Sequence, residues 1–403
     1  MDVKQNEKRL SALTVLLIAL AACLIYAVNG GIRSNYGMIR SSITAGTDIS
    51  YTNASFVLAV AQLTFGVMQP VFGMVALKRS NSFVLCCGAV LVLVGLVAIP
   101  YCTSTWMLLL FLGLLMPGGL GAFSFGIIMG AITPVLGPRR AATVSGFVSA
   151  SLGAGSMIFS PIIQGFLSAH GLRAALLALC VPVVLLIPIA LWLSRYSDQK
   201  TPAASEEKES LASLFREAVK NRSYLCLLGA FTTCGFYMAI IDTHLYNHIT
   251  ALGFSAETAA FAFSIYGVAT ILGSICSGSV MTRIGMKWTL GGLFAVRPVI
   301  IAAFLLLPRS LAAVYGFAAL LGFTGASTVP PTSGLVGRIF GAKKLGTLFG
   351  IAFFFHQIGA FFSAWLGGIL LTATGGYAAI WIASGILAAV AALLSFSVKE
   401  PTA

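Results

Sequence analysis

GPRRAATVSG at positions 137–146 and GAKKLGTLFG at positions 341–350 are two copies of one pattern, 204 residues apart. Each copy follows a long apolar run and places glycine, two basic residues, threonine and glycine at the same relative positions. A second match joins the stretch from Gly73 to Arg79 with the stretch from Gly278 to Arg283, at an offset of about 205. Two matches at one offset predict two homologous halves, related as a parallel repeat.

The chain is far more apolar than a soluble protein. Of its 403 residues, 58% are hydrophobic and only 9% are charged, whereas soluble domains carry about 25% charged residues. A membrane-spanning helix needs about 20 apolar residues, so the chain has room for about a dozen spans. We therefore predict an all-α integral membrane protein in a lipid bilayer.

Apolar runs separated by glycine, proline or basic clusters predict twelve transmembrane helices, six in each half. The predicted helices cover residues 11–40, 53–77, 83–101, 105–134, 141–168, 173–194, 223–249, 257–281, 287–307, 311–338, 345–371 and 376–397. The first run follows basic residues like a signal peptide, but it continues past Ala27, and we interpret it as a retained helix.

Two pseudo-symmetric six-helix bundles are expected, at residues 1–194 and 223–403. The stretch 195–222 between them has the highest charge density in the chain and is predicted to be a linker. Its segment 210–219 predicts a short amphipathic helix at the membrane surface. We expect the protein to be a monomer.

The distribution of basic residues predicts the orientation. All but five of the 24 Lys and Arg residues lie on the side of the predicted N-terminus; the five are Arg33, Arg40, Arg173, Arg297 and Arg309. Because basic loops remain in the cytoplasm, we predict that both termini and the linker are cytoplasmic and that the protein lies in the plasma or inner membrane. The net charge of +13 is spread over short loops, which argues against a nucleic-acid partner.

Motifs of other function classes are missing from the sequence. There is no GxxxxGK[ST] phosphate loop, no HExxH motif, and no CxxC spacing among the eight cysteines. We therefore expect neither an enzyme nor an ATP-driven pump, and no cofactor or metal site.

One loop carries a family resemblance. Residues 278–287 read GSVMTRIGMK and fit the pattern GxxxDRxGRR/K through Gly278, Arg283, Gly285 and Lys287, with Thr282 at the aspartate position. The first-half copy begins at Gly73, with Leu77 at the aspartate position and Lys78 at the arginine position. The chain thus resembles transporters of the major facilitator superfamily, which implies their twelve-helix fold and a role for these loops in conformational change.

Further motifs are similar to the bacterial monocarboxylate-porter and oxalate/formate-antiporter-like group. They are Asn29-Gly30-Gly31, Thr243-His244-Leu245, Arg297, LGTLFG at 345–350, His356-Gln357 and WLGG at 365–368. This resemblance implies a carrier for small organic anions.

Four polar residues of the first predicted helix share one helical face. Asn29, Arg33, Tyr36 and Arg40 are spaced by four, three and four residues. We interpret Asn29, Arg33 and Tyr36 as substrate-binding residues. Arg40 is interpreted chiefly as a side chain that snorkels to the headgroups, an alternative that also stays open for Arg33.

Arg297 lies about ten residues inside its predicted helix, too deep for easy snorkelling. A guanidinium can hold a carboxylate by two parallel hydrogen bonds, so Arg297 is a candidate anion ligand. A structural ion pair or a contact with backbone carbonyls is the alternative.

The seventh predicted helix holds Asp242, the only one of the eleven acidic residues well inside a span. Asp242 and His244 point in different directions, because two residues correspond to about 200° around a helix. At the 204-residue offset His244 corresponds to Arg40, and Tyr237 corresponds to Arg33. This relation favours Tyr237 and His244 as substrate ligands, although at an offset of 205 the preference for His244 over Asp242 weakens.

Proton coupling has three candidate carriers: Asp242, His244 and His356. A buried partner for an arginine or an amide is the alternative role of Asp242. His356 and Gln357 interrupt an apolar run in the eleventh predicted helix and are candidate ligands, with a buried packing role as the alternative.

The sequence thus predicts a secondary transporter that moves a small organic anion by alternating access, coupled to protons or to anion exchange. Efflux of an amphipathic drug or metabolite is the competing transport hypothesis. A membrane sensor on a transporter scaffold is the competing hypothesis of another class.

Overall fold

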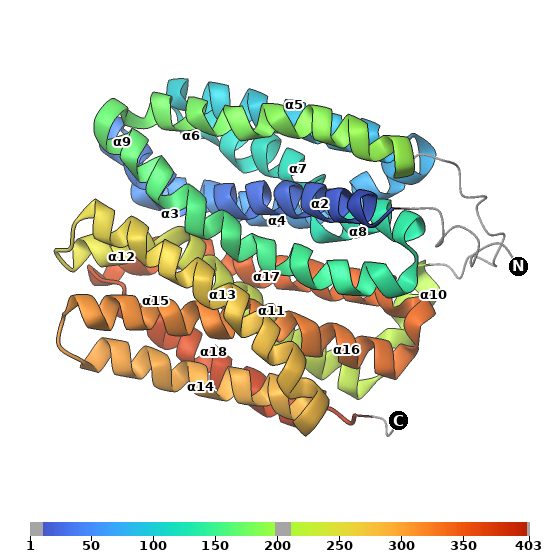
Figure 1. Ribbon diagram of the computed structural model, residues 1–403. Helices are drawn as coiled ribbons and strands as arrows, with labels where there is room; N and C mark the ends of the chain where they lie inside the picture. The colour runs from blue at the N-terminus through green and yellow to red at the C-terminus, as the bar shows by residue number, and fades with distance from the viewer. Residues whose placement is uncertain (1–10, 198–210, 401–403) are drawn as a thin grey trace, which may run out of the picture.

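The computed structural model describes residues 11–197 and 211–400, and all regular structure within these ranges is helical. The helices run roughly side by side (Figure 1). The start of α2 and the end of α18 lie at the same end of the molecule, which we call the terminal end. The opposite end is called the distal end.

The helices of the first half span residues 12–197. They are α2 (Ala12–Arg33), α3 (Tyr36–Gly46), α4 (Tyr51–Lys78), α5 (Asn81–Ala98), η1 (Ile99–Tyr101), α6 (Thr105–Leu108), η2 (Leu109–Leu115), α7 (Met116–Gly121), α8 (Phe125–Leu136) and α9 (Pro138–Ser197).

The described helices of the second half follow the same order of long elements. They are α10 (Leu211–Ala218), α11 (Arg222–Ile240), η3 (Ile241–Leu245), α12 (Tyr246–Ala251), α13 (Ala256–Ile284), α14 (Met286–Leu306), α15 (Leu311–Gly325), η4 (Ala326–Thr328), α16 (Val329–Phe340), α17 (Ala342–Thr374) and α18 (Ala378–Phe396). α10 confirms the helix predicted at 210–219, of which residue 210 lies outside the described residues.

Eleven helices of the described chain are long and apolar enough to cross a membrane. One of them, Thr143–Leu193, has 51 residues, far more than the roughly 20 that one crossing needs. The backbone at Gly171 inside it is not helical, with φ 76° and ψ −177°. The two arms of α9 are therefore separate crossings, and the prediction of twelve spans is confirmed.

Polar caps explain where many of these helices begin. The side chain of the residue before each helix accepts a hydrogen bond from a backbone N–H of the first turn, which has no partner inside the helix. The capping residues are Ser11, Ser50, Ser80, Ser104, Asn221, Ser255 and Ser310.

The repeated decapeptides form matching turns. Gly137 has φ 75° and ψ 161°, and Gly341 has φ 83° and ψ 161°. Only glycine adopts a positive φ at little cost, so both copies need it where one helix ends and the next begins. The repeat seen in the sequence is thus also a repeat of backbone conformation.

The first crossing differs from its prediction because it is interrupted. α2 ends at Arg33, α3 begins at Tyr36, and the crossing continues to Gly46 rather than ending near residue 40. Asn29 and Arg33 therefore lie on one helix, and Tyr36 and Arg40 on another.

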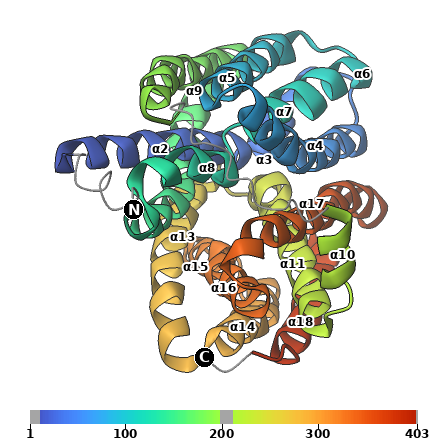
Figure 2. The same cartoon turned by 90° about the vertical axis from the view of Figure 1, so that its right-hand side faces the viewer.

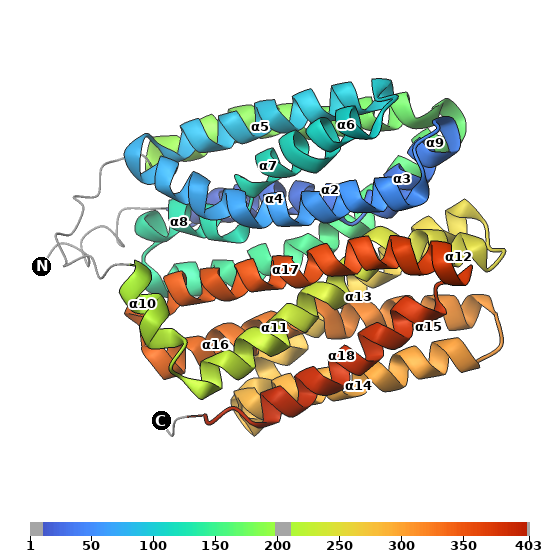
Figure 3. The ribbon, with the colours of Figure 1, turned by 180° about the vertical axis from the view of Figure 1, so that it is seen from behind.

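The halves form two bundles, seen from the terminal end in Figure 2. They meet where α9 packs on α13 and where α4 packs on α17, the second contact being visible in Figure 3. A Cβ atom on Gly153 of α9 would collide with the carbonyl of Gly267 on α13, and the reverse substitution would collide equally. Small residues thus let the halves approach closely.

Candidate functional site

Hydrogen bonds between the two halves gather in the distal part of the described structure. Several of them join α3, α4 and α17 with η3, α12 and the residue before α18. They include Arg40 with Thr243, Tyr51 with Tyr377, Thr52 with Thr372, and Asn247 with the Gly37 carbonyl. Tyr246 with Gln164 and Ser168 with Glu257 also join the halves in this part of the structure.

Arg40 lies at the centre of these contacts and is completely buried. Its Nη1 donates to Ser55 Oγ at 2.9 Å and contacts His244 Nδ1 at 3.2 Å. Its Nη2 donates to Tyr51 Oη and to the Thr243 carbonyl, both at 2.5 Å. The interpretation of Arg40 as a snorkelling side chain is therefore wrong. We call Arg40, Tyr51, His244 and Tyr377 the distal latch.

The contacts of His244 define its tautomer. An arginine can only donate hydrogen bonds, so Nδ1 is an acceptor and the ring proton resides on Nε2. Nε2 faces the Ala364 carbonyl at 3.1 Å. The imidazole fits against α17 because residue 367 is glycine, whose Cβ, if present, would collide with the ring. His244 is thus neutral, and both of its nitrogens have partners in the closed latch.

Tyr51 extends the latch to the far side of the second half. Its hydroxyl lies 2.9 Å from His244 Nδ1 and 3.0 Å from the hydroxyl of Tyr377. The guanidinium of Arg40 also lies 3.9 Å from the centre of the Tyr51 ring, a cation–π contact. The latch therefore connects three crossings through one hydroxyl.

A second polar group, the central cluster, surrounds Arg33 deeper in the molecule. Arg33 Nη2 donates to Gln62 Oε1 at 2.7 Å, and its guanidinium lies 4.0 Å from the centre of the Phe65 ring. Tyr36 is fully buried beside it and interacts electrostatically with Arg33. These residues all come from the first half.

Asp242 brings a negative charge to the central cluster from the second half. It lies in the π-helical segment η3 and is only 9% exposed. It interacts electrostatically with Arg33 and Tyr36. No nitrogen of Arg33 lies within the 4.0 Å salt-bridge distance of its carboxylate. Asp242 and Arg33, from opposite halves, thus interact electrostatically without forming an ion pair.

The central cluster contains buried donors that lack acceptors within the described residues. They are Arg33 Nε, Gln62 Nε2 and the Tyr36 hydroxyl. Buried polar groups are nearly always hydrogen-bonded. An ionised carboxylate accepts hydrogen bonds and donates none, so it would complement these donors. The cluster is therefore chemically suited to an anion.

Asn29 lies elsewhere. It is completely buried, and its Nδ2 donates to the Phe123 carbonyl at 2.9 Å, inside the first half. Its carbonyl oxygen has no partner among the described residues. Asn29 and Arg33 thus contact different residues, although both belong to α2.

Arg297 and Tyr237 form a pair inside the second half. Arg297 is completely buried, its Nη2 donates to the Thr324 carbonyl at 2.6 Å, and its guanidinium lies 3.9 Å from the Tyr237 ring centre. The Tyr237 hydroxyl contacts Thr324 Oγ1 at 2.9 Å. All these partners belong to the second half, an arrangement typical of helix packing.

His356 and Gln357 lie on α17. The His356 ring stacks on Phe353 at 5.2 Å and packs against Phe231 at 4.8 Å. Gln357 is buried, its side chain occupies the space beside Gly66 of the first half, and its Oε1 has no partner among the described residues. Gln357 thus reaches across the interface, whereas His356 sits among aromatic rings.

Three residues of these sites, Gln62, Tyr51 and Tyr377, were not among the sequence candidates. Gln62 is an amide in the middle of the second span, which was the available signal. Tyr51 begins α4 and Tyr377 directly precedes α18, where tyrosine is common at membrane interfaces, so nothing marked them. Within the described residues no cluster of three or more His, Cys, Asp or Glu could hold a metal ion.

Comparison with known proteins now bears on this arrangement. The family model described as Major Facilitator Superfamily matches residues 22–296 and 243–403. The chain belongs to the Major Facilitator Superfamily. It is accordingly a multi-pass membrane transporter and not an enzyme.

Relatives within the superfamily are distant but cover most of the chain. Monocarboxylate transporter 13 of Bos taurus is 24% identical, over 92% of this chain and 85% of the relative. Monocarboxylate transporter 12-B of Danio rerio is 26% identical, over 86% of this chain and 79% of the relative. The uncharacterized MFS-type transporter YcxA of Bacillus subtilis is 24% identical, over 85% and 86%.

The fold is also that of a solved superfamily member. The crystal structure of a D-xylose-proton symporter aligns with a TM-score of 0.70 and 16% identity, covering 96% of this chain and 97% of that one. This likeness supports the overall fold.

The superfamily loop motifs lie at the terminal end. Gly285 turns the chain between α13 and α14 with φ 92°, while its counterpart Ser80 caps α5 with an extended backbone. Arg283, Lys78 and Arg79 are exposed. A carboxylate reaches this loop from the end of the described chain, because Glu400 accepts a hydrogen bond from the backbone N–H of Lys287 at 3.2 Å and pairs with Arg338 at 2.5 Å.

Proposed function

We propose that this transporter carries a small monocarboxylate-like anion by alternating access, with Arg33 as its principal ligand. The observation that carries the proposal is the set of buried donors around Arg33, which lack acceptors in the described structure. Relatives named monocarboxylate transporters support the same substrate class. Gln62 and Tyr36 would supply the remaining hydrogen bonds.

The distal latch supports alternating access. It joins the halves at the distal end, so separating its partners would open that end while closure near the terminal end completes the cycle. With the orientation proposed from the Lys and Arg bias, both termini are cytoplasmic and the latch faces outward. The described conformation would then be closed to the outside.

For coupling, we propose Asp242 as the proton carrier. Its carboxyl group interacts electrostatically with Arg33 without an ion pair, so it can respond to both the substrate anion and a proton. In the closed latch His244 has partners on both nitrogens, and His356 is stacked on Phe353. Both histidines remain candidates with weaker support, and anion exchange without a titrating residue is the alternative.

Transport assays in proteoliposomes test the substrate class. We expect uptake of labelled lactate or propionate but not of propionamide, and a loss of at least about tenfold in Arg33→Gln, since charge-assisted hydrogen bonds contribute roughly 1.5–3 kcal/mol. Arg33→Lys should retain part of the activity. Arg173→Gln, an exposed arginine of the first half, is the matched control. Equal uptake of propionamide would instead favour the efflux hypothesis for uncharged or amphipathic compounds.

The coupling proposal is tested by measuring two transport modes, uptake driven by a pH gradient and anion counterflow, in the same variants. Asp242→Asn should abolish uptake driven by a pH gradient while leaving anion counterflow largely intact. His244→Gln and His356→Gln are measured in parallel. If the wild-type protein exchanges anions but ignores a pH gradient, proton coupling is wrong and Asp242 serves binding or packing.

A further inference from the structure

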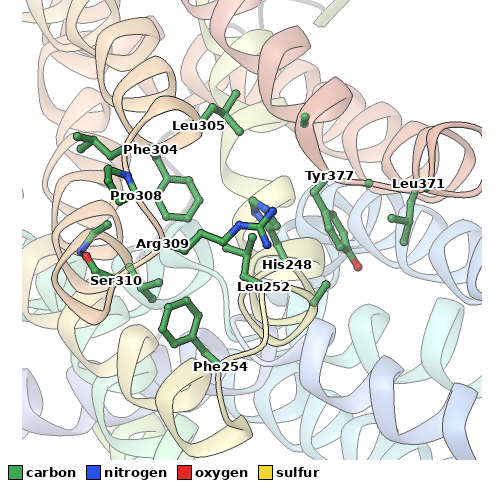
Figure 4. A pocket seen from close by; sticks show the side chains of 17 residues that line it. His248, Leu252, Phe254, Phe304, Leu305, Pro308, Arg309, Ser310, Leu371 and Tyr377 are labelled. Carbon is green, nitrogen blue, oxygen red and sulfur yellow. Dashed lines mark hydrogen bonds between the residues drawn. The ribbon is translucent and has the colours of Figure 1, made fainter.

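A separate cavity opens at the distal end of the second half, away from the central cluster. Its volume is about 360 Å³, within the range of small-molecule sites. Arg309 and Ser310 come from the loop between α14 and α15, His248 from α12, and Tyr377 from the start of α18. Phe254 and Phe304 supply apolar surface (Figure 4).

The polar side chains of this cavity can all donate hydrogen bonds. Arg309 is exposed and has no hydrogen-bond or ion-pair partner among the described residues. Its charge acts on His248, and Figure 4 shows the two side chains extending toward each other. None of the residues lining the cavity is acidic. The cavity is therefore electropositive.

His248 is held in one tautomer. Only 7% of the residue is exposed, and its Nδ1 accepts a hydrogen bond from Trp381 Nε1 at 2.8 Å. An indole N–H can only donate, so the imidazole proton is on Nε2. No described residue accepts from Nε2, which is not enclosed by protein. The buried ring thus presents a fixed N–H donor beside a guanidinium.

We propose that this cavity is a second anion-binding site, which takes a carboxylate bearing an apolar or aromatic group. The carboxylate would accept hydrogen bonds from Arg309, His248 Nε2 and the Ser310 hydroxyl, while the apolar group lies against Phe254 and Phe304. Arg309 is one of only two arginines in the predicted distal loops, where basic residues are otherwise avoided. An anion ligand accounts for its position.

The site is adjacent to the distal latch. The Tyr377 ring lies 5.0 Å from the His248 ring, and the Tyr377 hydroxyl bonds to Tyr51 of the other half. A bound carboxylate would therefore touch a residue that holds the halves together, and its occupancy would favour one state of the latch. The binding site itself does not depend on the function proposed for the central cluster.

Binding of benzoate to the purified full-length protein tests the proposal. The Arg33→Gln background removes the central anion ligand, and isothermal titration should still detect one benzoate site there. Adding Arg309→Gln should weaken this binding about tenfold or more, because a charge-assisted contact is lost. Benzamide, the uncharged analogue, should not bind. Quenching of tryptophan fluorescence by benzoate should disappear in Trp381→Phe.

Arg173→Gln is the matched control, since Arg173 is the other arginine of the predicted distal loops and packs over Tyr101 in the first half. Its benzoate affinity should equal that of the Arg33→Gln parent. The proposal is overturned if Arg309→Gln leaves affinity unchanged, if Arg173→Gln lowers it equally, or if benzamide binds as well as benzoate. Circular dichroism and gel filtration confirm that each variant is folded.

Discussion

Arg40 and Arg297 have nearly the same surroundings but belong to different kinds of region. Both are completely buried, both stack on a tyrosine ring at 3.9 Å, and both donate to a backbone carbonyl. The partners of Arg40 include the other half, whereas those of Arg297 all lie in its own half. Burial of a charge therefore does not identify a functional residue. What matters is whether its partners separate during the transport cycle.

The largest effect is expected from Arg40→Ala. Its removal leaves Ser55 Oγ and the Thr243 carbonyl without the donor they have here, and each unpaired buried group costs about 1–3 kcal/mol. We expect transport to fall roughly 100-fold and the distal end to open. A Thr52→Cys reporter in a cysteine-free background should then react faster with a membrane-impermeant maleimide. Unchanged labelling would mean that Arg40 does not hold the halves together.

Arg297→Met should have a different signature, because it disturbs one half rather than the interface. We expect a lower melting temperature, corresponding to a loss of roughly 2 kcal/mol for the hydrogen bonds to backbone carbonyls. The folded fraction should keep the wild-type KM and wild-type Thr52→Cys labelling. A raised KM at unchanged stability would show instead that Arg297 binds the anion, as one sequence hypothesis held.

Tyr377→Phe tests what a single hydroxyl group contributes to the distal latch. It removes the 3.0 Å contact with Tyr51 and keeps the ring against His248. Because one hydrogen bond contributes about 1 kcal/mol, the latch equilibrium should shift about fivefold, measured as labelling rate at Thr52→Cys. Tyr315→Phe is the control, since Tyr315 contacts Phe261 edge-on at 5.6 Å. A similar shift in both variants would contradict a specific role for Tyr377.

The smallest effect concerns pH. In the closed latch His244 Nδ1 accepts from Arg40 and faces the hydroxyl of Tyr51, so the ring can bind a proton only when the latch opens. Proton uptake therefore favours the open form, and labelling at Thr52→Cys should rise a few-fold as pH falls below about 6.5, the ordinary imidazole value. His244→Gln should remove this dependence, and His356→Gln should preserve it. A labelling rate that does not change with pH in the protein with wild-type His244 would contradict this prediction.

Much of the fold followed from the sequence, because apolar runs and paired glycine-basic turns report directly on membrane crossings. The role of Arg40 did not. The prediction ended the first helix near residue 40, where a side chain can reach the headgroups, but the break after Arg33 and the continuation to Gly46 turn Arg40 inward. His248 was missed for a related reason: only its pairing with Trp381, far away in the sequence, fixes its donor toward a cavity.

The contact between Arg40 and His244 also bears on the origin of the chain. At the 204-residue offset of the repeated decapeptides these residues correspond to each other, and they touch. In a symmetric homodimer of a half-length ancestor, a position on the two-fold axis meets only its own copy, and two buried arginines would repel each other. Joining the two copies in one chain lets the partners differ, so that a cation meets a neutral acceptor. Fusion thus makes possible an asymmetric contact that a homodimer of identical chains cannot form.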